Sequence, residues 1–521
     1  MAELLEPLAE RFGDGIALAD ERGTTSWTEF NERVNRLMSA LRAAGLKNDD
    51  AIAILSENRR EYYECMVAAT HLGLRYVPVN WHWVAEEISY VLENSDAKAL
   101  ITGEQFAGLG AEALAQPDCP ALNLALTMRD EAPEGFLSYE AVLAENPAEN
   151  LPATGLGGPM FYTSGTTGRP KGVISGAFSG DDKPVALMMM VGQAIVGNLG
   201  MPEAGHTLLI GPVYHSAQWA FSFLPLLAGN GIVMRHGFDA EEALDLIDEY
   251  AITNIHLVPT QFVRLLRVDK ERRGRFDGSS LQAVWHGAAP CSPEIKRKMI
   301  EWWGPKISEY YGSTESAIIS TISSEEWLER PGSLGKPLPN LEVRVIKEDG
   351  SVAKTGESGQ LYFRNQMGTD FEYHKDPEKT KAAHLEPGVF SVGDIGYLDD
   401  DGYLFMSDRK IDMIISGGVN IYPAEIEGVL VSHSAVADAA VFGIPNEEFG
   451  EEVKAAVELL PGFAASDELA ETLKTHCRDH LAGYKVPRSV DFEDKLPRHP
   501  TGKLYKRLLR DRYWEGRDRK I

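Results

Sequence analysis

Short apolar runs alternate with longer amphipathic stretches over the first four-fifths of this 521-residue chain. Residues 51–55 and 75–79 are predicted strands, and residues 59–72 between them have the periodicity of a helix. The rhythm returns with predicted strands at 207–210, 254–258, 281–285 and 306–310 and predicted helices at 240–250 and 293–303. Strands separated by helices favour parallel sheets covered by helices, so we predict an α/β fold. Ligands of such folds bind at loops beyond the carboxyl ends of the strands.

From about residue 334 the pattern changes to hairpins, with strands at 341–346 and 359–363 and a strand–turn–strand at 396–405. A smaller unit follows, in which Pro423 opens a helix, strands are predicted at 436–444 and 453–459, and a charged helix covers 467–481. We predict a large N-terminal domain of parallel-type sheets with a β-hairpin region, a hinge, and a small mobile α+β C-terminal domain. Their bounds are 1–407, 408–412 and 413–521.

The charge balance narrows the range of partners. Lys and Arg number 51 against 78 Asp and Glu, which gives a net charge of −27. Such a surface repels phosphate backbones, so we expect no nucleic-acid partner, and an anionic ligand must meet locally positive loops or helix N-termini. The four cysteines show no paired spacing, which indicates neither a zinc site nor disulfides and favours the reducing cytoplasm.

The N-terminus lacks a basic region followed by an apolar stretch, so we expect no signal peptide. The most apolar run, residues 186–201, is shorter than a bilayer span and is interrupted by Gln193 and Asn198. We predict a buried helix there and no integral membrane segment.

A loop rich in glycine and hydroxyl groups, Tyr-Thr-Ser-Gly-Thr-Thr-Gly-Arg-Pro-Lys-Gly at residues 162–172, ends in a single lysine. Its backbone can fold closely around phosphate oxygens and offer N–H donors, hydroxyls and one ammonium. It differs from a Walker A loop, because Arg169 and Pro170 precede the lysine and no Ser or Thr follows it. Alone it also fits a solvated linker.

Further segments downstream carry residues that could bind the other parts of a nucleotide. In Tyr-Tyr-Gly-Ser-Thr-Glu at 310–315, an aromatic face can stack on a purine and Glu315 can hold Mg²⁺ against a triphosphate. Asp394 in a Gly-Asp turn can accept two ribose hydroxyls. Arg409 and Lys503 alone look like ordinary solvated charge.

Together and in this order, these segments resemble the adenylate-forming superfamily of acyl-CoA synthetases, coumarate- and benzoate-CoA ligases, firefly luciferase and peptide-synthetase adenylation domains. The resemblance covers nearly the whole chain, from residues 25–30 to 500–503. Residues 162–172 are similar to the family's phosphate loop, and residues 408–427 to its interdomain hinge and the glycine turn that follows.

The resemblance implies a role for each matching residue. The residues at the β- and γ-phosphates would be Thr163, Ser164, Gly165, Thr166, Thr167 and Lys171. The adenine slot would be formed by Gly287, Ala288, Ala289 and Tyr311, and Gly312 would also belong to the ATP site. Thr314 would contact the α-phosphate, and Asp394 and Arg409 would hold the ribose. Thr166 and Glu315 would hold Mg²⁺. The catalytic set would be Lys503, which bridges the substrate carboxylate and the α-phosphate, together with Thr314, Glu315 and Lys171. Ser416, Gly417 and Gly418 would line a tunnel for the pantetheine of coenzyme A once the small domain rotates.

The acyl pocket is predicted at His215, Trp219, His286 and Gly287. We expect a hydrophobic acid because of the methionines at 188–190, the aromatic residues Trp219 and Phe221, and the small pair at 287–288. A medium- or long-chain fatty acid and a bulky ring-bearing acid both stay open. One position departs from the family, since Ile411 stands where relatives carry a charged residue, which leaves the pivot of the hinge undecided.

We therefore predict an ATP- and Mg²⁺-dependent acid–CoA ligase that makes an acyl-AMP, releases pyrophosphate and then forms a thioester. One alternative is an acyl-AMP ligase that passes the acyl group to a carrier protein or another acceptor. Another is a nucleotide-binding regulator without turnover, which the presence of both Lys503 and Glu315 disfavours. The sequence leaves the oligomeric state open, a homodimer included.

Overall fold

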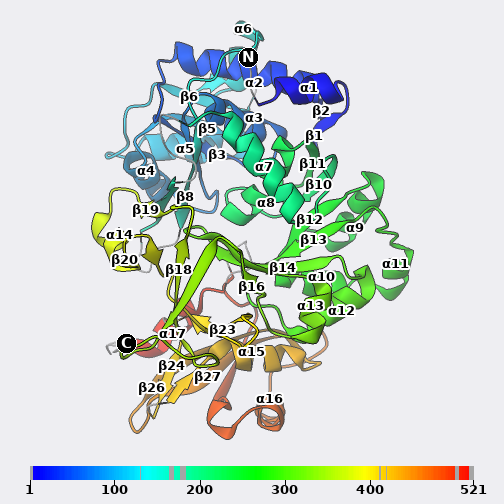
Figure 1. The fold of residues 1–521 in the computed structure, drawn as a ribbon, viewed down its shortest axis with the longest axis vertical. Helices are drawn as coiled ribbons and strands as arrows, with labels where there is room; N and C mark the ends of the chain where they lie inside the picture. Colours follow the sequence, from blue (N-terminus) through cyan, green and yellow to red (C-terminus); the bar gives the residue numbers. More distant parts are fainter. Residues whose placement is uncertain are drawn as a thin grey trace.

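The computed structural model describes residues 4–129, 131–163, 169–176, 183–409, 412–417, 419–498 and 504–515. Figure 1 shows a large domain built from the N-terminal part of the chain and a smaller C-terminal unit at the bottom of the view. No helix among the described ranges is both long and apolar enough to span a membrane.

The described strands of the large domain form two extended sheets. The first runs in the order β16 (Lys336–Pro337), β15 (Ala317–Ile322), β14 (Ile307–Ser313), β13 (Ala283–His286), β12 (Asn254–Leu257), β10 (Gly205–Leu209), β11 (Asn230–Met234), β1 (Ile16–Asp20), β2 (Gly23–Ser26). The pairs from β14 to β1 are parallel, and the outer strands at both ends pair antiparallel. The strands predicted at 207–210, 254–258, 281–285 and 306–310 are confirmed within a few residues.

The second sheet has the order β19 (Phe371–Tyr373), β9 (Lys171–Ser175), β8 (Gly158–Thr163), β4 (Arg75–Pro78), β3 (Ala51–Leu55), β5 (Ala97–Thr102), β6 (Leu124–Thr127), β7 (Leu137–Ser138). Its parallel part runs from β8 to β7, whereas β8, β9 and β19 pair antiparallel. The helices are α1 (Glu6–Phe12), α2 (Trp27–Ala43), α3 (Arg60–His71), α4 (Ala85–Asn94), α5 (Ala107–Leu114), α6 (Tyr139–Glu145), α7 (Ala186–Asn198), α8 (Ser216–Leu227), α9 (Ala240–Glu249), α10 (Pro259–Leu266), α11 (Lys270–Arg275), α12 (Pro293–Trp303) and α13 (Ser324–Glu329).

Helix α8 joins the two sheets because both of its faces are apolar. Trp219 donates its Nε1 hydrogen to the hydroxyl of Tyr76 on β4 over 2.8 Å. Two residues further on, the ring of Phe221 stacks on His256 of β12 with 4.8 Å between centroids. The helix therefore fixes the strand ends of both sheets against each other, which is where ligands of α/β folds bind.

Helix α7 corrects the prediction for residues 186–201. The helix forms, but it is buried only along Met188, Gly192 and Val196, while the side chain of Met190 is 63% exposed. Gly192 packs so closely on α8 that a Cβ there would lie 2.6 Å from the carbonyl oxygen of Leu224. Because α7 is covered mainly by α8, as Figure 1 shows, its other faces are left at the surface.

The hairpin region is confirmed as a third sheet, with β17 (Leu341–Ile346), β18 (Gly359–Asn365), β20 (His384–Glu386), β21 (Val389–Phe390), β22 (Asp394–Leu398) and β23 (Leu404–Arg409), flanked by α14 (Pro377–Ala383). The small domain holds β24 (Ile414–Ser416), β25 (Val419–Ile421), β26 (Val436–Asn446), β27 (Gly450–Leu459) and β28 (Ser489–Glu493). Helices α15 (Pro423–Ser432) and α16 (Asp467–His480) cover one face of this sheet, and α17 (Lys506–Trp514) packs on the other. The predicted α/β class with a small α+β domain is confirmed.

Candidate active site

The predicted phosphate loop is closed by a hairpin. Thr163, the last residue of β8, pairs directly with Lys171, the first residue of β9. The residues between them that were assigned to phosphate binding, Ser164, Gly165, Thr166 and Thr167, lie outside the described residues. Both anchors stand at the strand end, so the loop starts and finishes where a parallel sheet presents its ligand site.

Lys171 lies near the carboxylate predicted to hold Mg²⁺. Its ammonium sits 4.8 Å from the ring centre of Tyr373, and the hydroxyl of Tyr373 donates to Oε1 of Glu315 over 3.0 Å. Burial lowers the pKa of Lys171 and the nearby Lys379 lowers it further, whereas Asp376 and Glu315 act in the opposite direction. The fold thus brings Lys171 of the second sheet to Glu315, which follows β14 of the first.

The residues predicted for the nucleoside also converge. Tyr311 donates its hydroxyl to Oδ2 of Asp394 over 2.5 Å, and Asp394 is only 3% exposed. In the β22–β23 ladder, Arg409 is the direct partner of Asp394. Residues from β14, β22 and β23 are therefore held together, and a carboxylate at such a place can accept hydroxyl hydrogens from a sugar.

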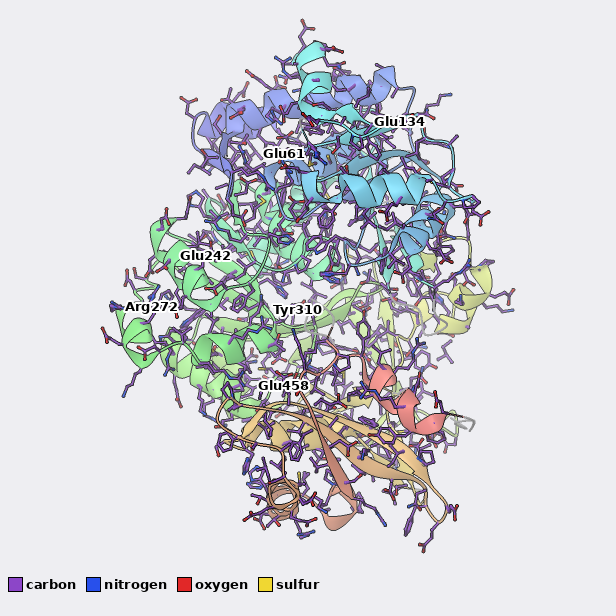
Figure 2. The ribbon with its side chains drawn as sticks, turned by 180° about the vertical axis from the view of Figure 1, so that it is seen from behind. Glu61, Glu134, Glu242, Arg272, Tyr310 and Glu458 are labelled. Atoms are coloured by element: carbon purple, nitrogen blue, oxygen red, sulfur yellow. The ribbon has the colours of Figure 1, made fainter. Side chains whose placement is uncertain are left out.

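The loop predicted to bind adenine requires a small residue at its first position. A Cβ on Gly287 would lie 2.6 Å from the ring of Tyr310 and 2.7 Å from its carbonyl oxygen. The next residue, Ala288, has φ of 65°, a left-handed conformation that is rare for a residue with a side chain. Figure 2 labels Tyr310 near the centre of the molecule, beside which this loop leaves β13.

Thr314 lies beside the start of α8. Its hydroxyl oxygen is 2.9 Å from that of Ser216, the first residue of the helix. His215 is the N-cap of α8, and its ring lies 4.4 Å from that of Tyr214. The predicted α-phosphate contact and the predicted acyl-pocket histidine are therefore neighbours at a helix N-terminus, which favours negative charge.

Tyr505 of the small domain acts electrostatically on Tyr214, the neighbour of His215. Burial raises the pKa of Tyr214, and the charge of Tyr505 raises it further. Arg498 and Leu504 form an isolated bridge, so the two ends of the segment that carries Lys503 are held together. Lys503 itself lies outside the described residues.

The residues predicted for coenzyme A have their described contacts inside the small domain. Ser416 pairs with Val419 and with Gly450, and Gly417 donates its backbone N–H to the carbonyl of Phe449 over 2.8 Å. Gly417 has φ of 58°, the left-handed region that favours glycine. Gly418 and the suspected pivot Ile411 lie outside the described residues.

The predicted acyl-pocket residues do not share one wall. His286 is fully buried and faces Phe262 and Glu309, with its Nε2 3.6 Å from Oε2 of Glu309. Trp219 points to the other sheet, toward Tyr76. Of the four predicted residues, His215 precedes Ser216, whose hydroxyl contacts that of Thr314, and Gly287 packs against Tyr310.

The sequence did not point to two polar residues of the candidate site, Tyr373 and Ser216. Tyr373 lies on β19, some 200 residues after the strand it pairs with, and Ser216 sits in an apolar segment. Neither belongs to a pattern with a chemical meaning of its own.

Known proteins match the chain along its full length. The family model of AMP-binding enzymes matches residues 5–369, and that of the AMP-binding enzyme C-terminal domain matches residues 425–503. A fatty acid–[acyl-carrier-protein] ligase of Streptomyces coeruleorubidus is 32% identical over 517 residues, 97% of this chain and 95% of the relative. A 2-succinylbenzoate–CoA ligase of Bacillus licheniformis is 33% identical over 515 residues, 97% of this chain and 98% of the relative.

Solved structures have the same fold. The o-succinylbenzoate CoA synthetase of Bacillus subtilis, in complex with its acyl-adenylate intermediate, superposes with a TM-score of 0.80. It is 28% identical, and the match covers 100% of this chain and 99% of that structure. The fold is therefore shared over nearly the whole length of both chains. The chain belongs to the AMP-binding enzyme family of the adenylate-forming superfamily and is an acid–thiol ligase.

Proposed function

We propose that this enzyme joins a hydrophobic carboxylic acid to coenzyme A in two steps, through an acyl-AMP. The observation that carries the proposal is the convergence of Lys171, Glu315, Thr314 and Asp394 at one set of strand ends. These groups come from separate sheets and match the phosphates, the metal and the ribose of one ATP molecule.

In the first step a carboxylate oxygen attacks the α-phosphorus of ATP, and pyrophosphate leaves. Both reactants are anions, so the barrier is mainly electrostatic and is lowered by donors that are fixed in advance. Thr314 at the N-terminus of α8 would contact the α-phosphate, Lys171 the departing phosphates, and Lys503 would bridge the two reactants. His215 would lie beside the acid.

The residues fit a magnesium ion that is shared with the substrate. Mg²⁺ is usually bound by one or two carboxylates, waters and substrate phosphates. Glu315 supplies one carboxylate near Lys171, and the described residues contain no group of three or more side chains that could hold a metal alone. Glu315 and Thr166 would hold the ion, which would offset charge on the phosphates.

In the second step the thiol of coenzyme A attacks the acyl carbonyl and AMP leaves. Ser416 and Gly417 would line the path of the pantetheine, but their described contacts lie within the small domain. The electrostatic effect of Tyr505 on the pKa of Tyr214 is consistent with an adenylating pose. A rotation about the segment after Arg409 would turn the face with Lys503 away from the active site. The face with Ser416 and Gly417 would then point toward it.

The acid is proposed to be hydrophobic because buried aromatic groups stand behind the reaction centre. Phe221, Tyr310 and Trp285 pack around His256, whose pKa is lowered to about 3 by burial, so that this imidazole is neutral at physiological pH. Phenylalanine, tryptophan and tyrosine side chains are likewise neutral at that pH, so these four side chains present no cation. A second carboxylate on the acid would find no cation among these described residues.

Transfer to a carrier protein is the second candidate, because one relative is a fatty acid–[acyl-carrier-protein] ligase. A panel of fatty acids of graded length and of ring-bearing acids, each assayed for AMP formation with and without coenzyme A, separates the cases. We expect AMP turnover that depends on coenzyme A, with at least one hydrophobic acid. Turnover that needs an acyl carrier protein and ignores coenzyme A would contradict the proposed acceptor.

A proline at the suspected pivot tests the domain rotation. Ile411→Pro restricts φ at a bond that the rotation is proposed to use. We expect pyrophosphate release to continue while thioester formation from the enzyme's own adenylate becomes much slower. Rapid quench of both steps checks this. Equal retention of both steps would remove Ile411 as the pivot, and the same change at Lys410 and at Asp412 then locates it.

A further inference from the structure

Tyr373 connects two residues to which the proposed function gives separate tasks. Its hydroxyl donates to Glu315 over 3.0 Å, and the ammonium of Lys171 lies 4.8 Å from the centre of its ring. The first contact is a charge-assisted hydrogen bond and the second a cation–π interaction. One half-buried side chain thus touches both the carboxylate proposed for the metal and the ammonium proposed for the phosphates.

The fold fixes Tyr373 before any ligand arrives. Strand β19 adds to the edge of β9 with Tyr373 opposite Val173, so Lys171 lies two residues away on the same face of β9. The backbone N–H of Tyr373 donates to Oγ1 of Thr380 over 2.9 Å, and that of His374 donates to the carbonyl of Gly172 over 2.8 Å. The strand cannot shift along β9 without breaking these bonds.

The tyrosine also keeps opposite charges apart. Although Lys171 and Glu315 lie close enough for Glu315 to raise the pKa of the lysine, these two described residues form no ion pair with each other, and each contacts Tyr373. A direct pair would turn the ammonium and the carboxylate toward each other. Instead, the ammonium of Lys171 faces the ring of Tyr373, and the carboxylate of Glu315 accepts a hydrogen bond from its neutral hydroxyl. Neither charge is neutralised by the other, so the ammonium stays available for phosphate and the carboxylate for the metal.

We propose that Tyr373 is a positioning residue for the metal–phosphate end of ATP, holding Glu315 and Lys171 in their binding arrangement. The proposal rests on the proposed function and deepens it at the same site. Its two contacts can be separated by substitution. Tyr373→Phe keeps the ring under Lys171 and removes the bond to Glu315, whereas Tyr373→Leu removes both.

Binding of ATP measured by calorimetry, without acid or coenzyme A and over a series of Mg²⁺ concentrations, tests the proposal. For Tyr373→Phe we expect the half-saturating Mg²⁺ concentration to rise about tenfold, as for loss of a hydrogen bond to a charged group, with near-normal ATP affinity at saturating Mg²⁺. For Tyr373→Leu we expect the same rise and a further loss of ATP affinity of about threefold at saturating Mg²⁺, from loss of the cation–π contact.

Tyr403 supplies a matched control away from the site. Its hydroxyl donates to Glu326 over 3.2 Å, and Lys336 lies 4.7 Å from its ring centre, on the hairpin that packs against α13. Tyr403→Phe and Tyr403→Leu should leave the Mg²⁺ dependence unchanged. An unchanged Mg²⁺ dependence in Tyr373→Phe, which differs from the parent by one oxygen, would overturn the proposal. Absence of ATP binding by the parent enzyme would instead overturn the proposed function.

Discussion

Lys503→Ala is expected to reduce formation of the acyl-adenylate by about 10²–10³-fold, the usual loss when one preorganised electrostatic contact is removed. Thioester formation from supplied acyl-AMP should stay nearly normal. The reason is that Lys503 belongs by sequence to the small domain, which we propose to rotate between two poses. It can therefore serve only the pose in which the small domain closes over the phosphates.

Single-turnover kinetics of the two half-reactions checks this expectation. Lys506→Ala is the matched control, because Lys506 lies three residues away and pairs with Glu427 inside the small domain at 2.9 Å. That variant should keep adenylation. Comparable losses in both half-reactions of Lys503→Ala would remove the lysine from its assigned place between carboxylate and α-phosphate.

Asp394→Ala is expected to weaken ATP binding by about tenfold to a hundredfold and to leave the apparent affinity for coenzyme A nearly unchanged. A carboxylate that accepts ribose hydroxyls contributes ~1.5–3 kcal/mol, because hydrogen bonds to a charged group exceed neutral ones. Asp394 is buried, accepts the hydroxyl of Tyr311 and pairs across the ladder with Arg409. Equilibrium binding of ATP to the variant measures the effect.

A loss of fold must be separated from a loss of binding in that experiment. Asp399 lies at the turn of the same β22–β23 hairpin, where it accepts the backbone N–H groups of Asp401 and Tyr403 over 3.0 and 2.8 Å. Asp399→Ala should lower the melting temperature and spare ATP affinity. If Asp394→Ala is folded and binds ATP as the parent does, Asp394 is an ordinary turn residue.

The fold could be predicted from the sequence where the pattern was local. Alternating strands and helices fixed the parallel sheets, and α12 begins at Pro293 and ends at Trp303, where helical periodicity and an N-terminal proline had placed it. The position of Thr314 and Glu315 followed from a further rule, that the loops after parallel strands meet at one edge. That rule does not place Asp394, which is the first residue of the antiparallel strand β22.

The directions of side chains in buried strands could not be predicted in the same way. Strand β13 reads Ala-Val-Trp-His, and all four side chains are buried, since helices cover both faces of a parallel sheet. Nothing in such a run says which residues face the ligand. The structure puts Trp285 against Phe221 and His286 against Phe262, on the opposite face.

Two other features depend on contacts between distant segments. Helix α7 is apolar on every side, so its sequence carries no stripe to show that only the Met188 side would be covered. Tyr373 reaches Lys171 only because β19 pairs with β9, and that pairing is a property of the whole sheet. Neither the covered side of α7 nor the pairing of β19 with β9 can be recognised from the residues of these segments alone.

Acid-dependent exchange of labelled pyrophosphate into ATP, measured without coenzyme A, tests the central claim most directly. An enzyme that forms acyl-AMP as a separate first step must run that step backwards, so we predict exchange that requires a hydrophobic acid and Mg²⁺, needs no thiol, and disappears in Lys503→Ala. Thioester formation without any such exchange, accompanied by ADP and phosphate in place of AMP and pyrophosphate, would contradict the account.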